Sequence, residues 1–215
     1  ENDSRKSREI YEQVLKNNSD DHDALVGMMR LELLKGDKKA ALSYLERAVA
    51  ASSKDGRLAK IELSMVAMMM GDVKEAKRLL LSITEETPKD LLAWSLLAAV
   101  TMQQWDSARD EKAKAAFRKE IAERYLPAME KNTNNPYDYY LQITKAFLMM
   151  RSGDDKLRQA RDAFAAAARS RPDSLAAQDL VLGLDITLND KVSAEVHARD
   201  VLYRNRNAPL ANYVM

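Results

Sequence analysis

Gly-Asp pairs, with one Asn-Asp pair, recur along the chain in two sets of similar spacing. Gly36-Asp37 and Gly71-Asp72 lie 35 residues apart, and Gly153-Asp154 lies 36 residues before Asn189-Asp190. Each pair follows an apolar-periodic stretch of about three to four helical turns, where Gly or Asn can adopt the left-handed conformation that ends a helix. This spacing predicts a chain of stacked helical repeats, because periods of roughly 20–50 residues are typical of such arrays.

Prolines mark the other end of each repeat. Pro88, Pro136, Pro172 and Pro209 are separated by 48, 36 and 37 residues. A proline prevents a helix from continuing, because it lacks a backbone N–H and its ring clashes with the preceding turn. We therefore expect each of these prolines to follow the second helix of a repeat.

Between these markers, one helical face recurs with small and bulky residues in a fixed order. Its members are Ala41, Leu45 and Ala48; Ala76, Leu80 and Ile83; Ala160, Phe164 and Ala167; and Ala194, Ala198 and Val201. Offsets of four and three place each set on one face of a helix. The small residue lets a partner helix approach, and the bulky one fills the groove between them. A single helix pair cannot bury such a face, so neighbouring repeats must stack.

The composition favours a mostly helical chain and excludes several classes of site. The 215 residues include only 6 Gly and 5 Pro, which favours helix over sheet or disorder. The absence of Cys excludes disulfides, thiolate zinc sites and cysteine nucleophiles. With 34 Lys plus Arg against 33 Asp plus Glu, the chain has no global attraction for nucleic acid or anionic membranes. No apolar stretch approaches the roughly 20 residues that span a bilayer, so no membrane insertion is expected within this sequence.

The order of helix, Gly-Asp turn, small-large-small helix and proline resembles the tetratricopeptide repeat over nearly the whole chain. The aromatic residue that this family has early in its first helix is matched by Trp94 and Tyr140, whereas Leu25 and Lys60 stand there in the first two full repeats. The resemblance implies an all-α fold, a right-handed α-solenoid of antiparallel helix pairs with about 11–12 helices.

We divide the chain into one array of five full repeats and two partial ones. The boundaries are 4–21 (partial), 22–56, 57–90, 91–136, 137–173, 174–207 and 208–215 (partial). The third repeat is about a dozen residues too long for the family period. Its second helix is expected to run from Ser107 to Lys131, with a kink or break near Pro127. Because the chain begins at Glu1 and stops inside an expected helix, we interpret it as a fragment of a longer, bacterial-type protein.

The sequence contains no recognisable catalytic, cofactor-binding or metal-binding constellation. His22 and His197 lie 175 residues apart, and the acidic residues around His22 lack the spacing of a calcium loop. These acids stand at an expected helix start, where they would cap the helix. No glycine-rich phosphate loop or nucleophile elbow is present, and no aromatic ladder accompanies the basic runs at 112–119 and 199–206. We predict no enzyme activity, no cofactor, no metal site and no nucleic-acid partner.

The family resemblance places a partner-binding surface on the concave face, which the first helix of each pair lines. The residues expected there are Val26, Arg30 and Leu33; Ile61, Met65 and Met68; Leu92, Ser95 and Met102; and Leu141, Lys145 and Leu148. An apolar, Met-rich groove of this kind suits amphipathic helices and can adapt to several of them. Core packing is the alternative interpretation for each of these residues.

These residues favour a non-catalytic scaffold that binds a protein or peptide. Family members that bind a C-terminal carboxylate use cationic and amide side chains on the first helices, whereas Val26, Ile61 and Ser95 stand there in this chain, which disfavours that activity. Two alternatives stay open: self-association, for instance as a homodimer, and a regulatory repeat segment of a larger enzyme such as a glycosyltransferase. A looser resemblance to bacterial envelope and export proteins favours the cell envelope or periplasm, with the cytoplasm as the alternative.

Overall fold

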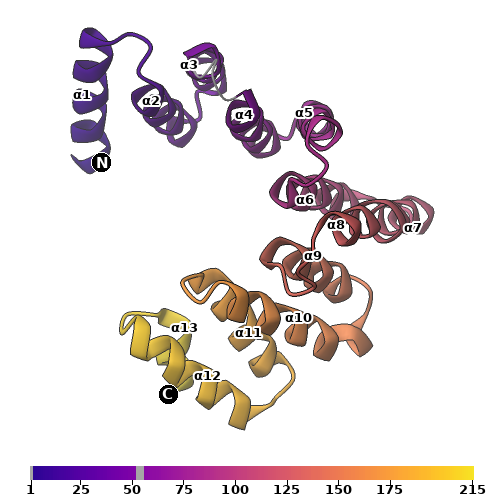
Figure 1. Cartoon of the computed structure of the whole chain (residues 1–215). Helices are drawn as coiled ribbons and strands as arrows, with labels where there is room; N and C mark the ends of the chain where they lie inside the picture. The colour runs from indigo at the N-terminus through magenta and orange to yellow at the C-terminus, as the bar shows by residue number, and fades with distance from the viewer. Residues whose placement is uncertain (1, 52–55) are drawn as a thin grey trace. The chain divides into compact units, whose positions relative to one another are not determined.

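The computed structural model describes residues 2–51 and 56–215, and every regular element in those ranges is a helix (Figure 1). Contacts divide the chain into two compact bodies, Glu1–Glu86 and Thr87–Met215. The described part of the N-terminal body contains α1 (Asn2–Asn17), α2 (His22–Lys35), α3 (Lys38–Ala51), α4 (Gly56–Met70) and α5 (Val73–Glu86).

The C-terminal body continues the same kind of architecture. It contains α6 (Leu91–Ser107), α7 (Glu111–Glu120), a π-helical segment (Ile121–Tyr125), α8 (Leu126–Asn132), α9 (Tyr139–Met150), a 3-10 turn (Asp154–Lys156), α10 (Leu157–Ser170), α11 (Leu175–Thr187), α12 (Lys191–Arg204) and α13 (Pro209–Val214). Because α7, the π-helical segment and α8 are continuous, twelve helical rods lie within the described ranges. The expected all-α fold of about 11–12 helices is therefore confirmed.

Consecutive helices pack as pairs, which confirms an α-solenoid of helix pairs as the fold class. Within the N-terminal body α2 packs on α3 and α4 on α5, and within the C-terminal body α9 packs on α10 and α11 on α12. The boundaries predicted for the repeats fall between these pairs, except that Gly56 opens α4. As a division into repeats, those boundaries stay a prediction.

Three of the four predicted turn pairs end one helix and begin the next. Gly36 and Gly71 have φ of 83° and 79°, and Asn189 has φ of 54°, so all three adopt the left-handed conformation expected of them. The prediction was wrong for Gly153, whose φ of 134° and ψ of 160° lie outside that conformation, and Asp154 opens a 3-10 turn without a side-chain cap. In the other three pairs the Asp caps the second helix; Asp37, for example, accepts a hydrogen bond from the Ala40 N–H at 3.0 Å. The dipeptide recurs because one residue must take a positive φ and the next must satisfy a free N–H at a helix start.

The recurring small and bulky residues form the core of the second helices. All twelve members of the four predicted sets are at most 4% exposed. Phe164, for example, is fully buried and its ring meets that of Phe147 edge-on at 5.1 Å. The period seen in the sequence is therefore the period of the buried face.

In the C-terminal body, the first helix of a pair is anchored by the side chain four residues after its N-cap. Trp94 Nε1 donates to the Pro88 carbonyl at 2.9 Å, and Gln142 Nε2 donates to the Pro136 carbonyl at 2.6 Å. Gln142, and not Tyr140, thus occupies the position of Trp94. The register predicted for α9 from Tyr140 was wrong by two residues, because an amide replaces the indole as the donor.

The long second helix of the third repeat differs from the prediction in two ways. It begins at Glu111 rather than Ser107, because Ser107 is still the last residue of α6. Pro127 does not break it; the π-helical segment Ile121–Tyr125 precedes the proline and the helix continues to Asn132. The wider π turn takes up an extra residue, so that Ile121, Tyr125 and Met129 are all fully buried.

In the part of the chain that the structure describes, none of the helices has both the length and the apolar character required to cross a membrane.

Candidate functional site

An apolar groove of about 420 Å³ lies between α2 and α4 in the N-terminal body. Its walls are the first helices of two successive pairs, and we call it the α2/α4 groove. It is lined by Val26, Met29, Arg30, Leu33 and Leu34 from α2 and by Glu62, Met65, Val66 and Met69 from α4. Each wall extends over about two helical turns.

The floor of the groove is part of the hydrophobic core, and its rim is open to solvent. Val26, Met29 and Val66 are buried and belong to the core cluster that also contains Leu45 of α3. On the rim, Leu34 is 80% exposed, Met69 70% and Met65 48%. Exposed apolar side chains that form a contiguous patch commonly mark an interaction surface, whereas singly exposed ones do not.

Two charged side chains accompany this apolar surface. Arg30 is exposed and has no hydrogen bond or ion pair within the described ranges 2–51 and 56–215. Glu62 Oε2 lies 3.3 Å from His22 Nε2. His22 Nδ1 lies 3.2 Å from the Ala48 carbonyl oxygen, so this side chain links α2, α3 and α4. As far as the described residues extend, the groove therefore presents an unpaired cation among apolar groups.

The acidic residues around His22 cap the helix, as the sequence predicted. Asp21 is the N-cap of α2 and accepts a hydrogen bond from the Ala24 N–H at 3.0 Å. Across the described residues, no group of three or more His, Asp or Glu side chains is arranged to hold a metal ion.

Four of the predicted concave residues line the groove, and two others from the same body do not. Val26, Arg30, Leu33 and Met65 lie on its walls. Ile61 is buried and Met68 is half-buried, and neither lines the groove. The prediction followed a single stripe on each helix and missed its flanks. Met29, Leu34, Glu62 and Met69 stand three or four positions from a predicted residue, and Val66 follows Met65 directly.

The predicted residues of α6 and α9 take part in packing within the C-terminal body. Ser95 Oγ accepts a hydrogen bond from Thr144 Oγ1 at 3.1 Å, which joins α6 to α9, and Met102 is buried. Lys145 Nζ lies 2.7 Å from Glu130 Oε1 of α8.

Leu141 is only 1% exposed, which corrects its predicted placement on an open face; the error follows from the shifted register of α9. Leu92 and Leu148 are half-buried. As contacts to a partner, the twelve residues stay a prediction.

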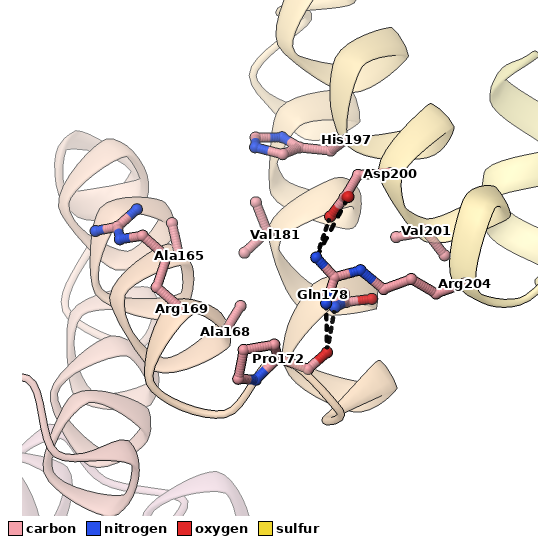
Figure 2. Close-up of a pocket in the computed structure, with 10 residues that line it drawn as sticks. All are labelled: Ala165, Ala168, Arg169, Pro172, Gln178, Val181, His197, Asp200, Val201 and Arg204. Carbon is pink, nitrogen blue, oxygen red and sulfur yellow. Dashed lines mark hydrogen bonds and ion pairs between the residues drawn. The ribbon is translucent and has the colours of Figure 1, made fainter.

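A second, more polar pocket of about 380 Å³ lies among α10, α11 and α12 (Figure 2). Its polar groups largely bind one another. Arg204 donates to the Pro172 carbonyl at 3.0 Å, and Gln178 Nε2 donates to the same oxygen at 2.8 Å. His197 also lines the pocket, and its Nδ1 lies 2.5 Å from the carboxylate of Asp185. These contacts join α11 and α12 to each other and to the loop that contains Pro172.

Asp185 is the centre of a buried polar cluster. It is fully buried and accepts a hydrogen bond from Arg161 Nε at 2.9 Å in addition to the contact with His197. The hydrogen bond to Asp185 raises the pKa of Arg161. The carboxylate is thus matched by a permanent cation, as a buried charge requires. Its role in the structure is to connect α10, α11 and α12.

Residues 33–100 match the family model described as tetratricopeptide repeat. No curated protein sequence matches the chain. Among solved structures, a thermophilic tetratricopeptide protein of Thermus thermophilus matches with a TM-score of 0.69 and 15% identity over 90% of this chain and 96% of that one. Yeast Tom70 matches with a TM-score of 0.67 and 13% identity over 96% of this chain and 41% of that chain. The hetero-tetramer Cut9-Hcn1 of the APC/C matches with a TM-score of 0.56 and 15% identity over 99% and 39%. At these identities the likeness shows the fold.

Proposed function

From the tetratricopeptide match of residues 33–100, we propose that the chain is a non-catalytic scaffold whose α2/α4 groove holds an apolar segment of a protein. The fold supports the role of a scaffold, because helical repeat arrays of this type present surfaces to protein partners. The binding of an apolar segment is supported by the α2/α4 groove, where predicted contact residues and exposed apolar side chains line the same concave surface.

The chemistry of the groove suits a protein segment better than a small polar ligand. Its rim residues Leu34, Met65 and Met69 are long and unbranched at Cβ, and the two methionines can adjust to different side-chain shapes. A partner that inserts apolar side chains gains about 25 cal/mol for each Å² of apolar surface removed from water. Arg30 can in addition form a charge-assisted hydrogen bond to an acidic side chain of that partner.

Affinity capture with matched variants tests this proposal. The chain with Met65→Glu places a charge in the groove at a half-exposed site, so the fold should survive. Ser43→Glu introduces the same charge on the exposed outer face of α3 and is the control. We expect quantitative mass spectrometry to find at least one protein that the wild-type and Ser43→Glu chains retain and the Met65→Glu chain loses. If all three chains retain the same proteins in equal amounts, the groove is not the binding surface.

A further inference from the structure

The outer face of α12 differs from that of the other second helices. In each of these helices, three positions lie opposite the buried small-large-small face: two residues before its first member, two after and nine after. In α3, α5 and α10 those positions carry exposed residues that are polar or small, namely Lys39, Ser43 and Ala50; Lys74, Arg78 and Glu85; and Arg158, Asp162 and Arg169. In α12 they carry Val192, Val196 and Tyr203.

These three residues of α12 form an exposed apolar stripe. Val192 is 76% exposed, Val196 61% and Tyr203 90%, while Ala194, Ala198 and Val201 on the other side of the helix are buried. The stripe is therefore not needed for the packing of α12. Three large apolar side chains in one row, at positions where the sister helices carry polar or small residues, have the composition of an interface.

The charges beside the stripe complement those of the α2/α4 groove. Glu195 and Arg199 flank Val196 on α12, are exposed, and have no ion pair or hydrogen bond within the described residues. The groove contributes Arg30 on α2, which is unpaired within the described residues and opposite in charge to Glu195, and it contributes Glu62 on α4, which also lies 3.3 Å from His22 Nε2. Charges of the same sign on the two surfaces would oppose the contact. Charges of opposite sign favour it and fix how far α12 is shifted along the groove.

The lengths of the two surfaces also agree. Residues 192–203 of α12 extend over about 16 Å at 1.5 Å per residue, and residues 26–34 of α2 extend over about 12 Å. An amphipathic helix that lays its apolar face into a groove between two helices is a recurrent mode of recognition.

We propose that the outer face of α12 of one copy docks into the α2/α4 groove of a second copy. This inference rests on the proposed function of the groove and names its occupant. The contact is head to tail, because two different surfaces meet. A third copy can add to the free surfaces of the first two, so the assembly grows into a filament or closes into a ring.

Complementation between two variants of the full chain tests this arrangement. Met65→Glu impairs the groove and leaves α12 intact, and Val196→Glu does the reverse; circular dichroism checks that both are folded. In sedimentation velocity we expect the wild-type chain to associate with rising concentration and each variant to stay monomeric. An equimolar mixture of the two variants should form a dimer and nothing larger, because only one intact pair of surfaces remains. Ser43→Glu, at the position of α3 that corresponds to Val196, should assemble as the wild type does.

A charge reversal provides a second readout that misfolding cannot imitate. Arg30→Glu should weaken the association, and adding Glu195→Arg to the same chain should restore it. A wild-type chain that stays monomeric at all concentrations overturns the inference, as does a variant mixture that stays monomeric while the wild type associates. If the groove captures another protein but the chain does not self-associate, the proposed function stands and only the second copy is excluded. If neither occurs, both proposals fail.

Discussion

Adding one methyl group at two glycines should change stability in opposite directions. Gly71 lies in the turn between α4 and α5 with φ of 79°, and a Cβ at this residue would meet nothing within 4 Å. Gly71→Ala therefore creates no clash, and its whole cost comes from forcing an L-residue into the left-handed region, about 1–2 kcal/mol. Gly183 lies inside α11, where a Cβ would also meet nothing within 4 Å. Gly183→Ala should stabilise the chain by about 0.5–1 kcal/mol, since alanine loses less conformational entropy in a helix.

Two spectroscopic signals separate the two bodies in this experiment. Both tryptophans, Trp94 and Trp105, lie in the C-terminal body, so their fluorescence follows the unfolding of the body that contains Gly183. Circular dichroism follows the helices of both. For a chain of this size, 1 kcal/mol shifts Tm by about 2–4 °C. We expect Gly71→Ala to lower the dichroism transition that tryptophan fluorescence does not follow, and Gly183→Ala to raise the fluorescence transition. If Gly71→Ala is neutral or stabilising, the account of the Gly-Asp turn is wrong.

Three further variants test the core, the buried cluster and a helix cap. Phe164→Ala removes a fully buried ring and should cost about 3–5 kcal/mol, seen as a lower urea midpoint with an unchanged slope. Asp185→Asn takes the charge from the carboxylate that binds Arg161 and His197. It should cost about 2–3 kcal/mol in the same assay, less than for a fully buried pair because both partners still contact water. Hydrogen bonds from Ser193 lower the pKa of Asp190, so its stabilising effect is complete above its unfolded-state pKa and is lost as pH falls through the lower folded-state value. Asp190→Asn should therefore make stability less sensitive to acid, and an unchanged pH profile would contradict this.

The repeat period made most of the fold predictable. The burial of a residue such as Leu80 is predictable because equivalent residues recur at a fixed offset from each Gly-Asp turn, and that offset can be read from the sequence alone. Hydrogen bonding to a backbone carbonyl is not visible in this way. Gln142 takes the role of Trp94 by donating to the Pro136 carbonyl, while the nearby Tyr140 accepts a hydrogen bond from Arg171 at 3.4 Å. Residue type alone therefore selected the wrong register for α9.

Local backbone geometry accounts for the other differences. A proline inside a helical pattern signals an irregularity, but the sequence does not show whether the chain breaks or inserts a π turn before Pro127. The start of α7 depends on Asp110, whose carboxylate accepts a hydrogen bond from the Ala113 N–H at 2.8 Å. The sequence pattern predicted Val26 and Met65 as lining residues. The other residues of the groove depend on how α2 and α4 lie beside each other, which the pattern does not show.

A photo-crosslinker at residue 69 tests the central claim most directly. Met69 lies on the rim of the α2/α4 groove, and a crosslinking amino acid at that position reacts only with what lies within a few ångströms of it. We expect covalent adducts at position 69 whose captured peptide is an apolar helical segment, and residues 191–204 of a second copy if α12 is the occupant. The same crosslinker at position 43, on the exposed face of α3, should give no such adduct. Equal labelling from both positions, or no protein adduct at position 69, would contradict the assignment of this groove as a binding surface.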